Sequence, residues 1–181
     1  MPGGSHSRDG AVSVPHWPHR LEQIEARLAY DHLAGQLIIA SLSAVTQGAP
    51  LSMHGTVTLT DPATVDLTAS AQADLAVLRS ALPERHAIQQ ASGAVHASAR
   101  IQGRLPDVQW QAEARLTEAS VTAQPLTDPL HHLQGTIRGS NAALATDDLT
   151  FTYKQVPVQV RATVTEWLAA PQIDGELKAQ E

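Results

Sequence analysis

Residues 108–117 read VQWQAEARLT, and this stretch decides the fold class because apolar and polar side chains alternate along it without a break. Successive side chains of a strand point to opposite faces of a sheet, so one face here is apolar and the other is hydrated. The apolar positions are Val108, Trp110, Ala112, Ala114 and Leu116. The stretch therefore predicts a long β-strand with one face in water.

The same two-residue period extends in both directions along the chain. An alternating run precedes this stretch, and two consecutive alternating runs after residue 148 predict a hairpin or meander. The apolar positions of these runs include Val95, Ala97, Ala99, Ile101, Phe151, Val156, Val158, Val160 and Val164. Noisier runs lie within 24–30, 37–42, 51–59 and 65–71, and Asp61-Pro62 predicts the turn between the last two. The chain is therefore expected to be mainly β.

Two segments depart from the simple alternation. Residues 37–42 are apolar at both parities, which indicates either a β-bulge or a strand covered on both faces. Asp74 is a helix-capping residue, and Leu75, Leu78 and Leu82 after it share one helical face that Pro83 would end. We expect one short helix near 74–82.

An internal repeat is visible at a spacing of just over a hundred residues. GTVT at 55–58 matches ATVT at 162–165, and residues 21–28 parallel 130–137. A repeat of this length indicates several strands per unit. We expect a flexible lead-in or expression remnant over 1–14, a first β repeat over 15–92 and a second β repeat over 93–181.

Composition narrows the classes of function. The 181 residues carry 12 Lys and Arg against 18 Asp and Glu, a net charge of −6, which argues against a nucleic-acid-binding surface. The absence of cysteine excludes disulfides, thiolate zinc sites and cysteine nucleophiles. The sequence contains no apolar run near the roughly 20 residues of a membrane span, and its opening lacks the apolar centre of a signal peptide. If the protein works in a cell envelope, its targeting and anchoring parts are expected outside this sequence.

Residues with catalytic or metal-binding chemistry do not form a recognisable set. His16 and His19 flank Trp17 in a proline-bounded segment that cannot be helical, and adjacent residues such as His131 and His132 point to opposite faces of a strand. Asp147-Asp148 is the one adjacent pair of carboxylates, and a turn is the expected setting for it. Nucleophile-elbow, phosphate-loop and zinc-protease motifs are absent. We therefore expect no enzyme activity, no metal and no cofactor.

The strand pattern raises the question of what covers the apolar faces. Aromatic residues make up 3% of the chain, so the apolar positions are mostly Ala, Val and Leu. The core of a β-sandwich is about 10 Å thick and is usually filled by larger side chains. We expect an elongated, curled antiparallel sheet that forms an open apolar groove able to hold hydrocarbon. A β-sandwich explains the alternation equally well and remains the alternative.

The order of these segments resembles the repeating β-rich body of the AsmA-like proteins, the bacterial envelope group that includes TamB. The resemblance rests on a loose rhythm of Leu, Gly and Pro and covers nearly the whole chain after Pro15. The segments that carry it are 51–82, 103–108 (GRLPDV), 116–121 (LTEASV), 133–137 (LQGTI), 144–149, 151–158 and 170–177 (APQIDGEL).

The resemblance implies a section of a periplasmic β-groove that conducts phospholipid from the inner toward the outer membrane. It implies an inner-membrane anchor in a segment not present in this chain, neighbouring repeats of a longer chain, and an outer-membrane protein as a further partner. The groove would hold phospholipid or another acyl-chain lipid on the 14 apolar positions named above, and it would need no cofactor. A structural or assembly module of the envelope that docks through its sheet edges is the competing hypothesis.

Overall fold

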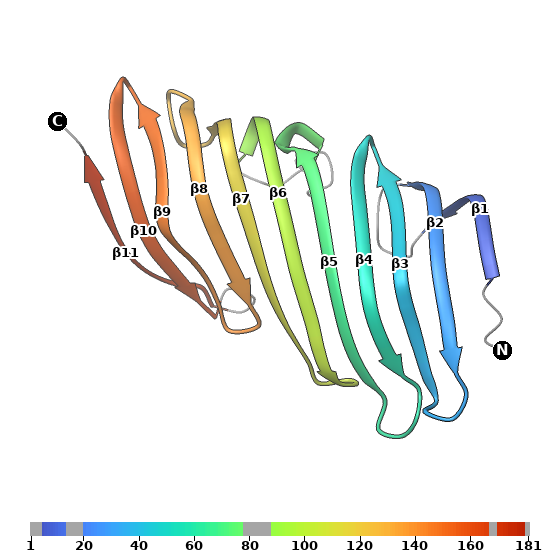
Figure 1. Cartoon of the computed structure of the whole chain (residues 1–181). Coiled ribbons are helices and arrows are strands. Elements are labelled where there is room, and N and C mark those ends of the chain that lie inside the picture. The colour runs from blue at the N-terminus through green and yellow to red at the C-terminus, as the bar shows by residue number, and fades with distance from the viewer. Residues whose placement is uncertain (1–4, 14–19, 78–87, 167–169, 180–181) are drawn as a thin grey trace. The chain divides into compact units, whose positions relative to one another are not determined.

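The computed structural model describes residues 5–13, 20–77, 88–166 and 170–179, with side chains described from residue 21 onward. Within these ranges, eleven strands form one antiparallel sheet in which every strand neighbours the next in chain order (Figure 1). The strands are β1 (Ser5–Ser13), β2 (Arg20–Asp31), β3 (Gln36–Thr46), β4 (Ala49–Thr58), β5 (Thr64–Asp74), β6 (Ile88–Arg104), β7 (Val108–Ala123), β8 (Leu130–Ser140), β9 (Ala143–Tyr153), β10 (Val156–Thr165) and β11 (Gln172–Ala179). The fold is therefore a single open sheet, as the alternation predicted, and the β-sandwich alternative is wrong.

The chain divides into two compact units. The first unit comprises Met1–Gln72 and Ser98–Gln111, and the second comprises Ala73–Ala97 and Ala112–Glu181. The predicted boundary between residues 92 and 93 falls inside β6, which runs through it as one strand. Alternation continues from one side of this position to the other, so the hydrogen-bonded ladder has no reason to stop there.

The first fourteen residues do not form a flexible lead-in throughout. Ser5–Ser13 is strand β1, which pairs with β2 through residue partners such as Val12 and Leu21. Its sequence is polar and carries little alternation, so the strand is defined by backbone pairing with a neighbour that the sequence pattern alone does not reveal.

The ambiguous segment within 37–42 contains a β-bulge, which was one of the two alternatives for it. In β3, Ile39 pairs with Gly55 of β4 and Leu42 pairs with Met53, so Ala40 and Ser41 oppose a single residue. Both bulge residues are exposed, whereas Ile39 before them is buried. The bulge shifts the parity by one, so the buried residue before it is at an odd position, Ile39, and the buried residues after it are at even positions, Ala44 and Thr46.

A matching bulge in β9 corrects the interpretation of Asp147-Asp148 as a turn. Val160 of β10 pairs with Leu149, and Ala162 pairs with Thr146, so the two aspartates lie inside the strand opposite one residue, Arg161. A carboxylate pair inside a strand is normally unfavourable. The bulge leaves both side chains exposed, where they remain hydrated.

The internal repeat reappears in the backbone conformation. Gln23 in β2 and His132 in β8 both have a positive φ, at 51° and 53°. The hairpin turn Gln47-Gly48 corresponds to Lys154-Gln155, and all four residues have positive φ, the conformation of a two-residue turn between twisted strands. With the bulges of β3 and β9, three backbone features therefore recur at the sequence repeat, and the predicted hairpin between β9 and β10 is confirmed.

The short helix begins where the sequence predicts. Leu75–Val77 is helical, and the Asp74 Oδ1 atom accepts a hydrogen bond of 2.7 Å from the Ala76 N–H. This bond satisfies one of the backbone donors that a helix leaves unpaired at its first turn. Leu78, Leu82 and Pro83 lie outside the described residues. Among the described residues, no helix is long and apolar enough to cross a membrane.

Candidate functional site

The two long central strands each have one exposed and one sheltered face. In β6, Val95 is buried and Ala97, Ala99 and Ile101 are half-buried, whereas the polar residues between them are exposed. In β7, Leu116 is buried. The positions Val108, Trp110, Ala112 and Ala114 are half-buried, and their polar neighbours are exposed. The predicted two-sided character of both strands is therefore confirmed.

In the second unit, the apolar face has a small buried cluster. Val95, Leu116, Ala119 and Leu133 are each at most 8% exposed, and they come from three adjacent strands. Leu75 of the short helix packs against this cluster, together with partly buried neighbours such as Phe151. The helix therefore covers one part of the apolar face.

The close approach of two strands at this cluster depends on a glycine. Gly93 in β6 has a φ of +111°, and a Cβ atom there would lie 2.5 Å from the Ala119 Cα atom of β7. Ala119 itself is completely buried. Only glycine adopts this backbone conformation readily while also leaving room for the neighbouring backbone.

Beyond the cluster, the apolar face of the second unit is incompletely covered. Val158 of β10 is 8% exposed, and Val160 and Val164 are half-buried. Val156 departs from the pattern because it is 43% exposed, next to the hairpin turn. Ile173 and Leu177 of β11 are 76% and 66% exposed. The shelter of this face therefore decreases toward β11.

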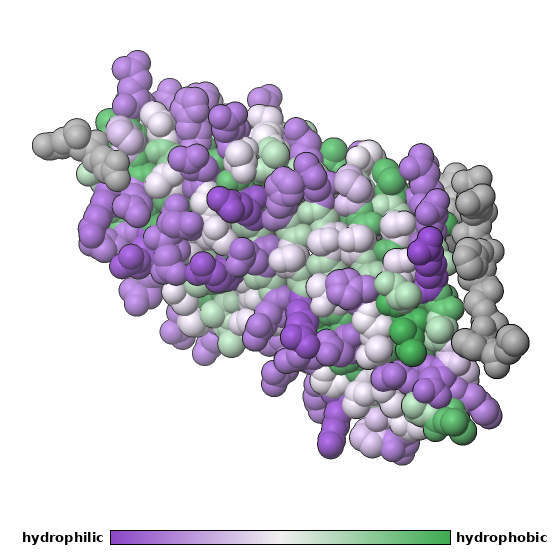
Figure 2. Space-filling model, viewed as in Figure 1, coloured by the Kyte–Doolittle hydropathy of each residue, from purple (hydrophilic) through white to green (hydrophobic). Residues whose placement is uncertain are grey.

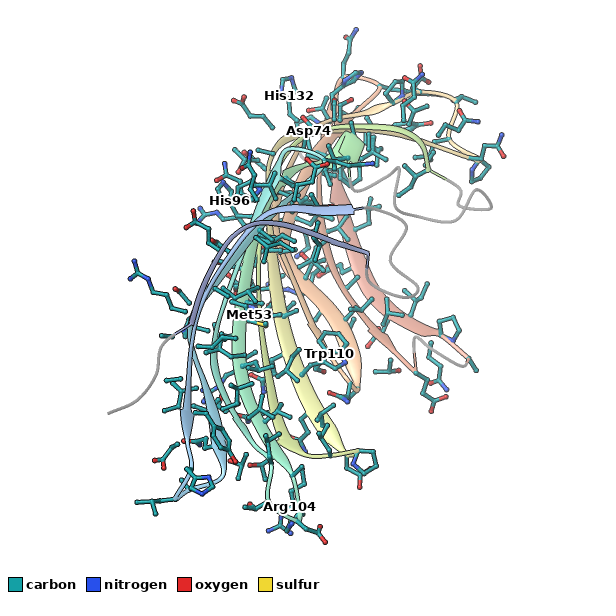
Figure 3. All side chains as sticks on the ribbon, turned by 90° about the vertical axis from the view of Figure 1, so that its right-hand side faces the viewer. Met53, Asp74, His96, Arg104, Trp110 and His132 are labelled. Atoms are coloured by element: carbon teal, nitrogen blue, oxygen red, sulfur yellow. The ribbon has the colours of Figure 1, made fainter. Side chains whose placement is uncertain are left out.

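The apolar face of the first unit is also shallow. Its most buried apolar side chains are Ile39, Ala44 and Ala49, at 4–8% exposure. Met53 and Trp110, both labelled in Figure 3, are half-buried. No large side chain among the described residues is less than 2% exposed, whereas the core of a layered domain contains several. Each unit therefore presents an aliphatic face that its own described residues cover only in part.

The opposite face of the second unit carries a row of charges of alternating sign. Arg138 of β8 lies between Glu113 of β7 and Asp147 of β9, with N···O distances of 3.6 and 3.1 Å. Arg161 of β10 lies 3.7 Å from the other oxygen of Asp147 and pairs in register with Glu176 of β11. Hydrophilic side chains gather over these last strands in Figure 2. All five side chains named here are exposed, so the row marks the hydrated face of the sheet.

This charge row is the feature that sequence reasoning missed. Its members lie far apart in the sequence, at positions 113, 138, 147, 161 and 176, and each lies on the polar parity of its own strand. The alternation of sign becomes visible only when strand register brings the charges together, because side chains that are opposed or diagonal across neighbouring strands interact.

One ion pair of the first unit changes a protonation equilibrium. Arg100 of β6 donates from Nε and Nη2 to the two carboxylate oxygens of Asp66 in β5, at 3.1 and 3.0 Å. These hydrogen bonds, with the charge of Arg100, hold the pKa of Asp66 below its usual value. Both side chains are more than half exposed, so the pair contributes little to stability.

The histidine and carboxylate candidates are dispersed. His96 and His132 are exposed and project away from the sheet (Figure 3). His131 is exposed as well, and its Nδ1 lies 3.4 Å from the Ser120 Oγ. His132 has a positive φ and lies at a register irregularity between His131 and Gln134, and both rings are exposed. His16, His19 and Trp17 lie outside the described residues.

No group of three or more His, Cys, Asp or Glu side chains within the described ranges is placed to hold a metal ion. Two threonines, Thr46 and Thr146, are buried. Thr146 donates from Oγ1 to the Thr136 carbonyl at 2.8 Å. The site is therefore an aliphatic surface with few polar directing groups.

Comparison of this chain with protein-family models, curated proteins and solved structures found no match.

Proposed function

We propose that this chain is a segment of an AsmA-like lipid-conduit protein of the bacterial envelope, whose apolar face shields phospholipid acyl chains during transport between the membranes. The observation that carries the proposal is the partial cover of this face. Aliphatic side chains at alternating positions of β6, β7 and β10 are sheltered on one side of an open sheet that has no second sheet over it in the described part of the chain. An acyl chain would complete that cover.

The chemistry of the face favours hydrocarbon as its ligand. The side chains are mainly Ala, Val, Leu and Ile, which offer contact without directional bonding. Each methylene of an acyl chain that leaves water for such a surface contributes roughly 0.8 kcal/mol of binding free energy. Because these contributions add along the acyl chain, binding does not require a deep pocket. The charged opposite face would remain in water, and headgroups would stay at the open side.

The proposed role is non-enzymatic, and the proposed setting follows from the resemblance. A section of an AsmA-like groove would lie in the periplasm, continue into neighbouring repeats and be held to the inner membrane by a segment outside this chain. It would also contact an outer-membrane protein. The resemblance in the order of Leu, Gly and Pro segments is what supports this setting.

Native mass spectrometry of the purified chain mixed with phosphatidylethanolamine tests the proposal. We expect adducts at the mass of the phospholipid, counted per protomer whatever the oligomeric state. A second readout is quenching of Trp110 fluorescence by phospholipid with brominated acyl chains, in a background with Trp17 and Trp167 replaced by Phe. Trp110 is half-buried on the apolar parity of β7, so a bound acyl chain would reach it.

Matched substitutions locate the lipid. We expect Ala99→Arg or Val160→Arg to weaken lipid capture at least tenfold, since a charge on the apolar face must lose water when an acyl chain covers it. Ser98→Arg and Thr163→Arg add the same charge to the exposed parity of the same strands and should leave capture unchanged. Equal capture by all four variants would contradict the proposal.

A further inference from the structure

Strand β11 presents an open, regular edge. It pairs with β10 over eight consecutive residue pairs without a bulge, and it is the last strand in the order of the described sheet. All eight of its residues are exposed. A straight, exposed edge offers a row of backbone donors and acceptors for a further strand.

Within the described residues, no strand lies on the outer side of β11, which is last in the strand order. Leu177 is 66% exposed, although its inner partner Val160 is half-buried. On the opposite face, Glu176 and Lys178 are exposed and form an ion pair of 3.3 Å within the strand. Glu176 also ends the alternating charge row, so a cation on the next strand would continue it.

The sequence of β11 is complementary to itself in one antiparallel register. When Leu177 of one copy faces Leu177 of a second copy, Glu176 of each strand lies opposite Lys178 of the other. Gly175 then faces Ala179, so small residues flank the leucine pair. Opposite charges at directly facing positions favour pairing, and like charges disfavour it.

Neighbouring registers that keep the apolar faces aligned place like charges opposite each other. Centring the pair on Gly175 places Glu176 opposite Asp174 twice. Centring it on Glu176 or Lys178 places that residue opposite its own copy. The register centred on Leu177 avoids all such contacts among residues 175–179.

We propose that two copies of this chain associate through β11 in this register, edge to edge and related by a two-fold axis at Leu177, so that the sheet continues across the pair. The partner at this edge is thus a second copy of the chain, because Glu176 and Lys178 of one β11 strand are complementary in charge to Lys178 and Glu176 of another. The interface is one strand wide and therefore weak, and it forms at high protein concentration. This inference does not depend on lipid binding; in a longer protein that continues past β11, the next repeat would occupy this edge in place of the second copy.

Sedimentation velocity over a concentration series tests the association. We expect a monomer–dimer equilibrium, and Lys178→Glu should weaken it about tenfold because two like-charge pairs replace two opposite-charge pairs. Lys154→Glu is the matched control. It makes the same charge change and breaks a similar exposed ion pair, Lys154–Asp128, away from β11.

Mixing variants separates charge complementarity from damage to the fold. Glu176→Lys alone should also weaken the dimer, since the new lysine of each copy would then face Lys178 of the other. An equimolar mixture of Glu176→Lys and Lys178→Glu should restore association as a heterodimer, because every charged pair becomes opposite again. A monomeric wild-type chain at all concentrations, or a mixture no better than either variant alone, would overturn the proposal.

Cysteine cross-linking reads the register directly, and the chain has no native cysteine to interfere. Leu177→Cys should form a disulfide-linked dimer on mild oxidation, because the two residues face each other. Ile173→Cys is the control: in this register the two copies of residue 173 lie eight positions apart, roughly 27 Å at 3.4 Å per residue, beyond the reach of a disulfide. Equal cross-linking at both positions, or none at residue 177, would refute the register.

Discussion

Gly93 should be among the least replaceable residues of the second unit. Replacing it with alanine adds a single methyl group, but the new Cβ atom would lie 2.5 Å from the Ala119 Cα and 3.0 Å from the Ala119 N. Ordinary contacts of a Cβ atom are 3.4–4 Å, so the backbone of β7 would have to move by about 1 Å. Ala119 is completely buried, and its surroundings leave little freedom for that movement.

Two effects add to the cost of Gly93→Ala. A φ of +111° is a conformation that residues with a side chain adopt at a cost of about 1–3 kcal/mol. Overpacking of a buried contact costs a further 1–3 kcal/mol or so. We therefore expect the free energy of unfolding to fall by about 4 kcal/mol.

Gly48→Ala is the matched control for this experiment. Gly48 also has a positive φ, at +79°, but no atom lies within 4 Å of the position where its Cβ would be. Its replacement carries only the conformational cost, about 1–2 kcal/mol. The two variants should therefore differ by roughly 2–3 kcal/mol, and the difference measures the close approach of β6 to β7.

Urea unfolding followed by far-ultraviolet circular dichroism measures both variants. With a slope of about 2 kcal/mol per molar urea, the midpoint of Gly93→Ala should lie about 1–1.5 M below that of Gly48→Ala. Equal midpoints would refute the reasoning, because they would show that β7 yields to the added methyl group without cost.

Two further predictions concern Asp66 and Asp74. In an NMR titration, the pKa of Asp66 should rise when Arg100 is replaced by Gln, because the two hydrogen bonds that hold the carboxylate in its charged form are lost. Since the pKa of Asp66 is lowered in the folded state, the pair stabilises the fold above the unfolded pKa of about 3.9, and this contribution is lost as the pH falls through the folded pKa. An unchanged titration in Arg100→Gln would contradict this interpretation. Asp74→Ala should lower the free energy of unfolding by about 1 kcal/mol, because the 2.7 Å cap on the Ala76 N–H is removed. Urea unfolding checks the second prediction, and a loss below about 0.3 kcal/mol would show that the cap contributes nothing.

The sequence by itself determined the class of the fold and the parity of its central strands. Alternation along 108–117 predicted which side chains of β7 are sheltered, because the two-residue period of a strand is a local property that needs no partner. The Asp74 cap was also predictable, because capping depends on a few consecutive residues. The same kind of local pattern narrowed residues 37–42 to two alternatives, and the structure has the bulge.

Tertiary structure decided what depends on pairing between distant segments. Ser5–Ser13 forms a strand although its polar sequence gives no such signal, and Asp147-Asp148 lies in a bulge instead of a turn. The charge row from Glu113 to Glu176 exists only through register. These features could not be read from the chain because hydrogen bonding between strands sets which residues face one another, and local sequence constrains only the face on which each residue lies.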